Sequence, residues 1–482
     1  MKFSTNTTHP LDVSADEFKT MMVEVVNLIS TFLTDLPNAP FFDRSGLQDF
    51  LKDPQVRTPP SETGRTLHEL LMILQRGIVN DSNIASGRAL VGIPGTGLVS
   101  SAIADLISGV FNRFTAFGVA SPAMVTLESD VLRWMMDLAG LPATAGGLLT
   151  SGASMATFSA FLCARSAHLT ENFLTGVIYA SDQAHHCVGK ALRLAGFPKT
   201  ALHTIPTDHA QHMNVDALRR EIARDRAAGL VPFCVVANGG STNSGSIDPL
   251  PALAALAREE GLWFHVDAAY GGFFLLTGRG RERLKGIECA DSVVMDPHKG
   301  LFLPLGTGCL LVRDAAILQR AHSGEMGSFM RDLGKFGAGV PQLPDFSSLS
   351  PELTRPFRGL RLWLPLHLHG VAAFRAALDE KLDLAEQLYS ALREMSDIRL
   401  IGPPELSIVA FSCRLPKASQ QDEDNATENL IRKINRPLLF QLATTKIQGR
   451  VVIRVPLMSP RTTAATLQEL LHAIESHRAV TA

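Results

Sequence analysis

The sequence predicts an α/β protein whose large domain is built on a largely parallel sheet. From about Ala143 onward, short apolar runs alternate with segments of helical periodicity, and the runs end in Gly, Ser, Thr or Asp. Strands that alternate with helices are typical of parallel sheets with crossover connections. The length of 482 residues, 46% of them hydrophobic, is enough for two or three domains with a large core.

The N-terminal part of the chain, residues 1–95, is predicted to be a helical arm. Ser14-Ala-Asp-Glu17 has the pattern of a capping box, and apolar residues recur at helical spacing over 18–32. The Pro-rich stretch 36–60 is expected to be extended, and a second helix is expected over about 66–79. Because this arm is too small for a core of its own, it should pack on another subunit or domain.

The next part, residues 96–368, is the predicted large domain. Its expected buried strands are 147–150, 176–180, 233–237, 262–266, 292–295 and 309–312. Ligands of such sheets lie outside the carboxyl ends of the strands, so the polar residues that end these strands are the candidates for function. The last part, 369–482, should form a small α+β domain. Its expected elements are the end of a helix over about 363–388, strands at 406–413 and 451–455, and a closing helix at 462–476.

Composition argues against several classes of protein. The chain has 45 basic and 47 acidic residues, so its net charge of -2 gives no reason to expect a nucleic-acid partner. None of the six cysteines forms a C-x-x-C pair, which favours free thiols in a reducing compartment and no metal site. The N-terminus lacks the apolar core of a signal peptide, and no apolar run approaches the ~18 residues of a membrane span. We therefore expect a soluble cytoplasmic protein.

Two of the predicted strand ends carry features that are ambiguous when taken singly. Ser151-Gly-Ala-Ser-Met-Ala-Thr157 places small residues at a strand-to-helix turn, where free backbone N–H groups and the helix dipole favour an anion. A simple tight turn explains the same residues equally well. Ser181-Asp-Gln-Ala-His-His-Cys187 places two adjacent histidines after the next strand, and such a pair more often lies on the surface.

Two further strand ends supply a carboxylate and a lysine. Asp267 ends an apolar strand, where a carboxylate is costly unless a cation meets it, although it could also cap a helix. Lys299 follows another apolar strand, where burial would make its amine nucleophilic, although lysines usually reach to solvent. Pyridoxal 5'-phosphate needs a lysine for its aldehyde, a carboxylate for its ring nitrogen and an anion site for its phosphate. The strand ends together supply all three.

With these motifs the chain resembles the group II pyridoxal-phosphate decarboxylases, the family of the aromatic-L-amino-acid, histidine and glutamate decarboxylases. The resemblance covers nearly the whole chain and rests on Ser121–Glu128, Thr150–Ser154, Asp182–His185, His265–Tyr270, Asp296–Lys299 and Arg358–Trp363. It implies fold type I: a large domain with a mainly parallel seven-stranded sheet, a helical N-terminal arm and a small α+β C-terminal domain.

The resemblance also implies roles for individual residues. Lys299 should carry the cofactor, Asp267 should keep the ring nitrogen protonated, and His185 should stack on the ring; these are the expected catalytic residues. The other expected cofactor contacts are Ala153 and Ser154 at the phosphate, Thr242, Ala269 on the opposite ring face, Asp296 and His298. Candidates on the substrate side are Arg454 from the small domain and Pro94, which ends the segment 86–94 where relatives place part of the substrate wall. Gly300 stands where relatives often have tryptophan.

The implied reaction is decarboxylation of an L-amino acid to the amine and CO2. In such decarboxylases a tyrosine on a loop of the neighbouring subunit helps to protonate the carbanion, but the corresponding loop here, about 323–348, contains no tyrosine. Phe329 falls at or near its position, and this replacement is associated with aldehyde synthesis in relatives. Oxidative deamination to an aldehyde is therefore the main alternative. A transaminase is also possible on the same fold.

A non-catalytic relative that binds the cofactor is a further alternative, disfavoured because Lys299, Asp267 and His185 are all retained. Aromatic, acidic and aliphatic amino-acid substrates remain open. The arm and the loop each need a second subunit to cover them, so we expect a symmetric homodimer.

Overall fold

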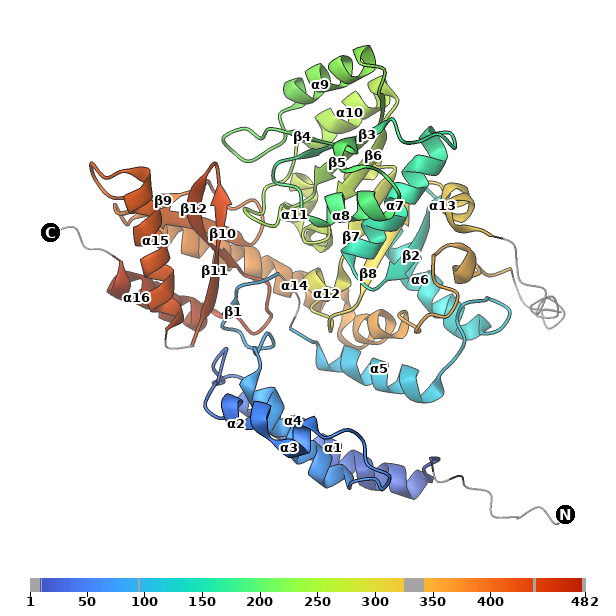
Figure 1. Ribbon diagram of the computed structural model, residues 1–482, viewed down its shortest axis with the longest axis vertical. Helices are drawn as coiled ribbons and strands as arrows, with labels where there is room; N and C mark the ends of the chain where they lie inside the picture. The colour runs from blue at the N-terminus through green and yellow to red at the C-terminus, as the bar shows by residue number, and fades with distance from the viewer. Residues whose placement is uncertain (1–8, 10, 94–95, 325–341, 437–438, 479–482) are drawn as a thin grey trace.

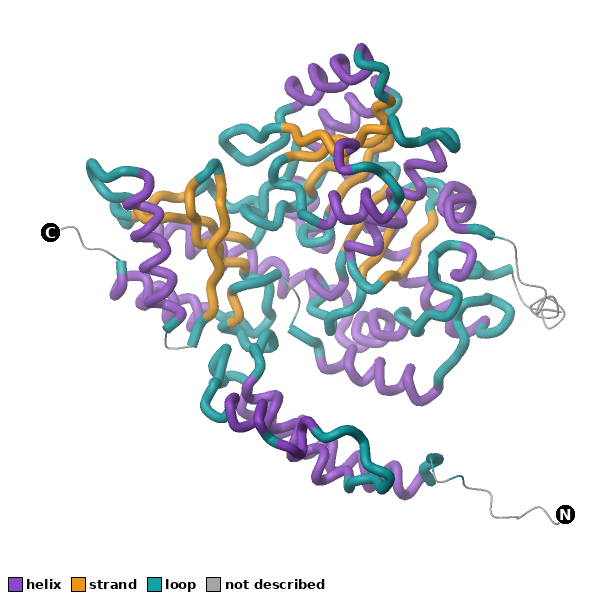
Figure 2. The backbone as a smooth tube through the Cα atoms, in the orientation of Figure 1, coloured by secondary structure: helices purple, strands orange, loops and turns teal. Residues whose placement is uncertain are grey.

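The computed structural model describes residues 9, 11–93, 96–324, 342–436 and 439–478. The chain forms an arm and two domains, and the arm lies to one side of both (Figure 1). The two domains contain separate sheets, each accompanied by helices (Figure 2). None of the helices in the described ranges is long and apolar enough to cross a membrane.

The arm consists of helices that bury little of their surface. Its elements are α1 (Ala15–Asp35), α2 (Leu47–Lys52), α3 (Pro54–Arg57) and α4 (Leu67–Asn80). Ser14 and Glu17 form the predicted capping box. None of the four helices has a buried residue. The expectation of an extended stretch over 36–60 is wrong where α2 and α3 form, because Asp53 caps α3 and Pro54 occupies its first position.

The large domain is built on a seven-stranded sheet with the order β2-β8-β7-β6-β5-β3-β4. The strands are β2 (Gly146–Thr150), β3 (Gly176–Ser181), β4 (Leu202–Ile205), β5 (Val231–Asn238), β6 (Trp263–Asp267), β7 (Ser292–Met295) and β8 (Gly308–Val312). Neighbouring strands are parallel from β4 to β7, and β8 is antiparallel to both of its neighbours. The prediction of a mainly parallel seven-stranded sheet is confirmed.

Helices cover both faces of this sheet. They are α5 (Val99–Phe111), α6 (Pro122–Leu138), α7 (Ala153–His168), α8 (Cys187–Leu194), α9 (Val215–Ala227), α10 (Leu250–Glu260), α11 (Gly278–Arg283), α12 (Pro297–Gly300) and α13 (Ala315–His322). Short 3-10 turns lie at Lys199–Ala201, Gly272–Leu276, Ile287–Cys289 and Phe346–Ser348. Val235 and Ala237 of β5 pack into one apolar cluster, whereas Cys234 and Val236 pack into the other. Both faces are therefore buried, which explains why the strands read as continuous apolar runs.

The small domain has a five-stranded sheet with the order β1-β11-β12-β10-β9. Its elements are β1 (Ala89–Leu90), β9 (Ile398–Leu400), β10 (Ile408–Cys413), β11 (Gln441–Ile447), β12 (Arg450–Pro456), α14 (Leu360–Arg393), α15 (Gln420–Asn435) and α16 (Ala464–His477). Strand β1 comes from the predicted arm and pairs in parallel with β11. Within α14, Gly370 breaks the helical geometry at φ 72°. We propose that the chain divides into 1–95, 96–368 and 369–482, because the helix break at Gly370 lies beside the boundary between the large and small domains.

Candidate active site

The carboxyl ends of the parallel strands surround a small cavity. Asn238 at the end of β5 pairs in register with Asp267 at the end of β6, and Lys299 lies in the short helix α12 that follows β7. The cavity is lined by Ala153, His185, Asn238, Gly240, Thr242, Asp267, Ala269, Tyr270 and Lys299. Six of these nine residues are candidates from the sequence, and the structure brings them together around one cavity.

Asp267 is a buried carboxylate in this cavity. Asp267 is 7% exposed, and its Oδ1 accepts a hydrogen bond of 3.1 Å from the N–H of Ala269. It has no cationic partner in an ion pair within the described ranges. Because a buried charge without a partner is costly, this site suits a ligand that presents a cationic N–H, such as a pyridinium ring.

Lys299 places its amine inside the protein. Its Nζ lies 3.1 Å from Oδ2 of Asp296, which is 1% exposed. Burial raises the pKa of Asp296, and its Oδ1 has no hydrogen-bond partner among the described residues. His298 donates from Nδ1 to the carbonyl of Thr307 at 2.5 Å, and its Nε2 lies 3.7 Å from Asp296 Oδ2. Lys299 is therefore a half-buried amine beside the cavity, and the surface-lysine alternative does not fit its position.

The turn between β2 and α7 offers an anion site. Helix α7 begins at Ala153, and its N-cap, Gly152, provides no side-chain hydrogen bond to the first-turn N–H groups. A Cβ at Gly308 would lie 2.4 Å from the carbonyl carbon of Gly152, so only glycine lets β8 approach this turn. The open N-terminus of a 16-residue helix suits a phosphate group. Ser154 is exposed at this turn and does not line the cavity.

His185 reaches the cavity as a neutral ring. Its Nδ1 accepts a hydrogen bond of 3.3 Å from the N–H of Cys187, and His186 lies beside it with the ring centroids 4.1 Å apart. Burial lowers the pKa of His185, and the charges of His186, Lys299 and Arg454 lower it further against the opposing effect of Asp267. A neutral imidazole can stack on an aromatic cofactor. Of the adjacent pair, His186 is the one on the surface.

Arg454 reaches the rim of the cavity from β12. Its guanidinium is held by the carbonyl oxygens of Thr242 and, at 2.8 Å, of Val91. The residue is 9% exposed, and burial lowers its pKa. The structure thus places Arg454 beside Thr242 of the cavity lining, and two of its donor groups are occupied by backbone carbonyls.

Three lining residues were missed by the sequence interpretation. Asn238 donates from Nδ2 to Ser181 Oγ at 2.9 Å and to Asp248 Oδ2 at 3.0 Å, which orients its amide. Burial raises the pKa of Asp248 to about 6. The Tyr270 hydroxyl bonds Ser407 of the small domain, and a Cβ at Gly240 would lie 2.9 Å from the Tyr270 ring. Asn238 could have been found, because it is a polar residue at the end of a buried strand.

Other predicted positions have different outcomes. Pro94 and Phe329 lie outside the described residues. At Gly300, a Cβ would lie 2.6 Å from the Cβ of Phe273. Phe273 therefore leaves no room for the tryptophan that relatives often carry at this position.

Comparisons with known proteins agree with this geometry. Residues 94–414 match the family model described as the pyridoxal-dependent decarboxylase conserved domain. The chain is 33% identical over 468 residues to an aromatic-L-amino-acid decarboxylase of Bacillus atrophaeus, covering 97% of this chain and 96% of the relative. It is 28% identical over 394 residues to a phenylacetaldehyde synthase of Arabidopsis thaliana, covering 79% of this chain and 80% of that protein.

A solved structure supports the same relationship. The crystal structure of Oryza sativa TDC with PLP and tryptamine superposes with a TM-score of 0.88 at 26% sequence identity. The alignment covers 98% of this chain and 99% of that one. Together with a buried carboxylate, a half-buried lysine and an open helix N-terminus around one cavity, these matches show that the chain belongs to the pyridoxal-dependent decarboxylase family, whose fold is type I.

Proposed function

We propose that this protein decarboxylates an L-amino acid to the corresponding amine and CO2 with pyridoxal 5'-phosphate as cofactor. The observation that carries the proposal is the meeting of Lys299 and Asp267 in one cavity beside the open N-terminus of α7. These groups match the aldehyde, the ring nitrogen and the phosphate of the cofactor in chemical type.

The roles of the side chains follow from their surroundings. When bound, the cofactor supplies an electron-accepting ring conjugated to the amino acid's Cα. Lys299 would hold it covalently, Asp267 would keep a proton on its ring nitrogen, and the backbone at Ala153 with His298 would hold its phosphate. His185 would stack on one ring face and Ala269 would pack against the other. A fixed, buried carboxylate stabilises developing charge without reorganising, which is usually a large part of catalysis.

A second candidate is decarboxylation coupled to oxidation, in which the amino acid, O2 and water give an aldehyde, CO2, ammonia and H2O2. The positions of the tyrosines support this second candidate. The chain has three tyrosines: Tyr179 donates to Asp225 at 2.8 Å, the Tyr270 hydroxyl bonds Ser407, and Tyr389 packs on the small-domain core. A second copy of the chain would bring the same three. No tyrosine of the loop type is therefore available as an acid, which leaves His185 or water to supply the proton.

The test is a panel of L-amino acids assayed together for CO2, amine, aldehyde, ammonia and H2O2. CO2 with one equivalent of amine supports the decarboxylase, whereas CO2 with aldehyde, ammonia and H2O2 supports the aldehyde synthase. In the second case, Phe329→Tyr should move the products toward amine. A protein that binds the cofactor but releases no CO2 from any amino acid would support the non-catalytic alternative and contradict both activities.

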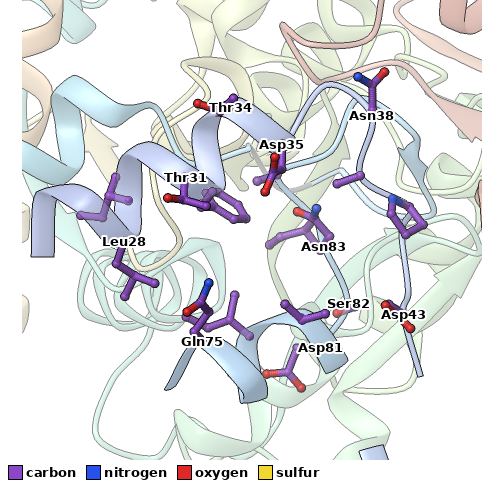
Figure 3. Close-up of a pocket in the computed structure, with 18 residues that line it drawn as sticks. Leu28, Thr31, Thr34, Asp35, Asn38, Asp43, Gln75, Asp81, Ser82 and Asn83 are labelled. Carbon is purple, nitrogen blue, oxygen red and sulfur yellow. The ribbon is translucent and has the colours of Figure 1, made fainter. Parts of the chain in front are cut away.

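We propose that the protein acts as a homodimer. Helix α1 exposes Val23, Val26 and Ile29, with 60%, 49% and 46% of each residue accessible to solvent. Between α1, α4 and residues 81–85 lies a hollow of about 750 Å³, into which Leu28, Thr31 and Gln75 project (Figure 3). Burial of such apolar faces against a second copy would stabilise the arm. All six cysteines are free and five are buried, which supports a cytoplasmic location.

A further inference from the structure

The segment that joins the arm to the large domain is held at two places near the Lys299 cavity. The carbonyl of Val91 shares the Arg454 guanidinium with the carbonyl of Thr242, which lines the cavity. The N–H of Leu98 donates to the carbonyl of Phe302 at 2.9 Å, and Phe302 follows Lys299 by three residues in the sequence. We call residues 85–93 and 96–98 the wall segment.

Arg461 of the small domain ties together the two ends of the wall segment. Its Nη1 donates to the carbonyl of Ala85 at 3.1 Å and to the carbonyl of Thr96 at 2.8 Å. Burial lowers the pKa of Arg461. A single nitrogen thus joins two backbone positions that lie eleven residues apart in the sequence, so this side chain links the two ends of the wall segment.

The contact around Arg461 is close and specific. Thr462 donates from Oγ1 to the carbonyl of Gly87 at 2.6 Å. A Cβ at Gly87 would lie 2.3 Å from the carbonyl oxygen of Arg461, so the two backbones can meet this closely only with glycine at that position. Strand β1 continues the contact by pairing Ala89 with Gln441. The small domain therefore contacts the wall segment at several positions, in addition to the arm, whose Pro37 carbonyl accepts a hydrogen bond of 2.9 Å from Arg88 Nη1.

We propose that Arg461 is a positioning residue that fixes the wall segment and, through Val91 and Arg454, the Thr242 side of the active site, and so determines how tightly substrates bind. This inference rests on the proposed amino-acid reaction at Lys299. Among the described residues, Arg461 forms no hydrogen bond to a residue that lines the cavity. It acts through the carbonyls at the two ends of the segment. Loss of its donor should weaken substrate binding more than it slows the chemical step.

The test compares Arg461→Met, which removes the donor, with Arg461→Lys, which retains one. On the best substrate of a panel containing L-tryptophan, L-phenylalanine and L-glutamate, Arg461→Met should raise KM about tenfold while kcat changes less than about twofold. Arg461→Lys should restore most of the loss. The cofactor absorbance should be the same in all three proteins. In hydrogen exchange, peptides covering 85–93 should exchange faster in Arg461→Met, and peptides around Lys299 should not.

Two further variants keep the test independent of a general loss of stability. Gly87→Ala disrupts the same contact from the wall segment, because its Cβ would clash with the backbone of Arg461, and it should give the same rise in KM. Arg399→Met removes another small-domain arginine, which pairs with Glu423 and has no hydrogen bond to the wall segment, and should leave KM unchanged. Equal effects of Arg399→Met and Arg461→Met, or an unchanged KM and unchanged exchange in Arg461→Met, would overturn the inference.

Failure of the proposed function would have a different signature. A wild-type protein that releases no CO2 from any amino acid would contradict the proposed reaction. The inference would then be judged by the amino-acid concentration that half-saturates the change in cofactor absorbance. An equal half-saturation in wild type and Arg461→Met would overturn it.

Discussion

The cofactor cavity and the N-terminal arm are built in opposite ways. The cavity lies at the ends of strands that are buried on both faces, and its two key groups, Asp267 and Lys299, are enclosed by their own chain. The arm helices α1 and α4 have no buried residues and leave apolar side chains in solvent. One chain is therefore enough to build the cofactor cavity, whereas the arm leaves apolar surface that the proposed second copy would cover.

The largest predicted effect is on the cavity. Asp267→Asn should lower kcat by about a thousandfold, because an amide cannot hold a charged ring nitrogen as a carboxylate does. Steady-state kinetics of the cofactor-loaded variant would measure this. Asp314→Asn is the matched control, since Asp314 caps α13 and an asparagine caps equally well. If Asp267→Asn retained wild-type kcat, the assigned role of this carboxylate would be wrong.

The next effect concerns the arm. Ile29→Asp should raise the dimer dissociation constant by at least about a hundredfold, because each copy would bury an unpaired charge. Sedimentation velocity would measure the dissociation, with Ser30→Asp on the same helix as the control. The dissociated monomer should still capture the cofactor with the wild-type absorbance. A monomer that failed to bind the cofactor would contradict the claim that one chain builds the cavity, since the cavity would then also depend on the second copy.

The complete burial of His265 beneath the cavity predicts that the free energy of unfolding depends on pH. His265, two residues before Asp267, is 0% exposed, and burial lowers its pKa to about 4. Below about pH 6.5, His265 binds a proton in the unfolded chain but stays neutral in the folded protein. The free energy of unfolding should therefore fall as the pH is lowered to about 4, by about 3 kcal/mol in total. His265→Gln should flatten this dependence in urea titrations, whereas His68→Gln in the exposed arm should not. Parallel pH curves for wild type and His265→Gln would contradict the prediction.

The smallest effect tests the link between the cavity and the small domain. The Tyr270 hydroxyl accepts the N–H of Ser407 at 2.8 Å and bonds its Oγ at 2.9 Å. Tyr270→Phe leaves the buried N–H of Ser407 unpaired, whereas Ser407 Oγ keeps its contact with Met458 Sδ, and should lower the free energy of unfolding by about 2 kcal/mol. Tyr389→Phe should cost less than about 0.5 kcal/mol in the same urea titration. Equal costs would show that the Tyr270 link contributes nothing specific.

The cofactor half of the site could be predicted from the sequence because it depends on local order. Asp267 and Lys299 each follow an apolar strand directly, and parallel strands bring such ends together whatever the details of the connections. The family resemblance added the role of His185, which the residues alone would have left on the surface. Asn238 was missed although it obeys the same rule, because the predicted strand ended one residue earlier, at Ala237.

Contacts between distant parts of the chain could not be predicted. The pairing of β1 with β11 and the two carbonyls held by Arg461 join residues more than 350 positions apart. No periodicity in the sequence encodes such pairs. Strand β4 was missed because Leu202–Ile205 is a short edge strand that is only partly buried. The helices α2 and α3 were missed because proline was taken to favour extended chain, whereas Pro54 begins a helix.

Reduction of the cofactor-loaded protein with borohydride, followed by peptide mapping, shows whether Lys299 carries the cofactor. Reduction fixes the cofactor to whichever amine holds it. We expect one equivalent of pyridoxyl phosphate on the peptide containing Lys299 and none on that peptide in Lys299→Ala. A label on a different lysine, or CO2 release by a protein that carries no label, would contradict this expectation.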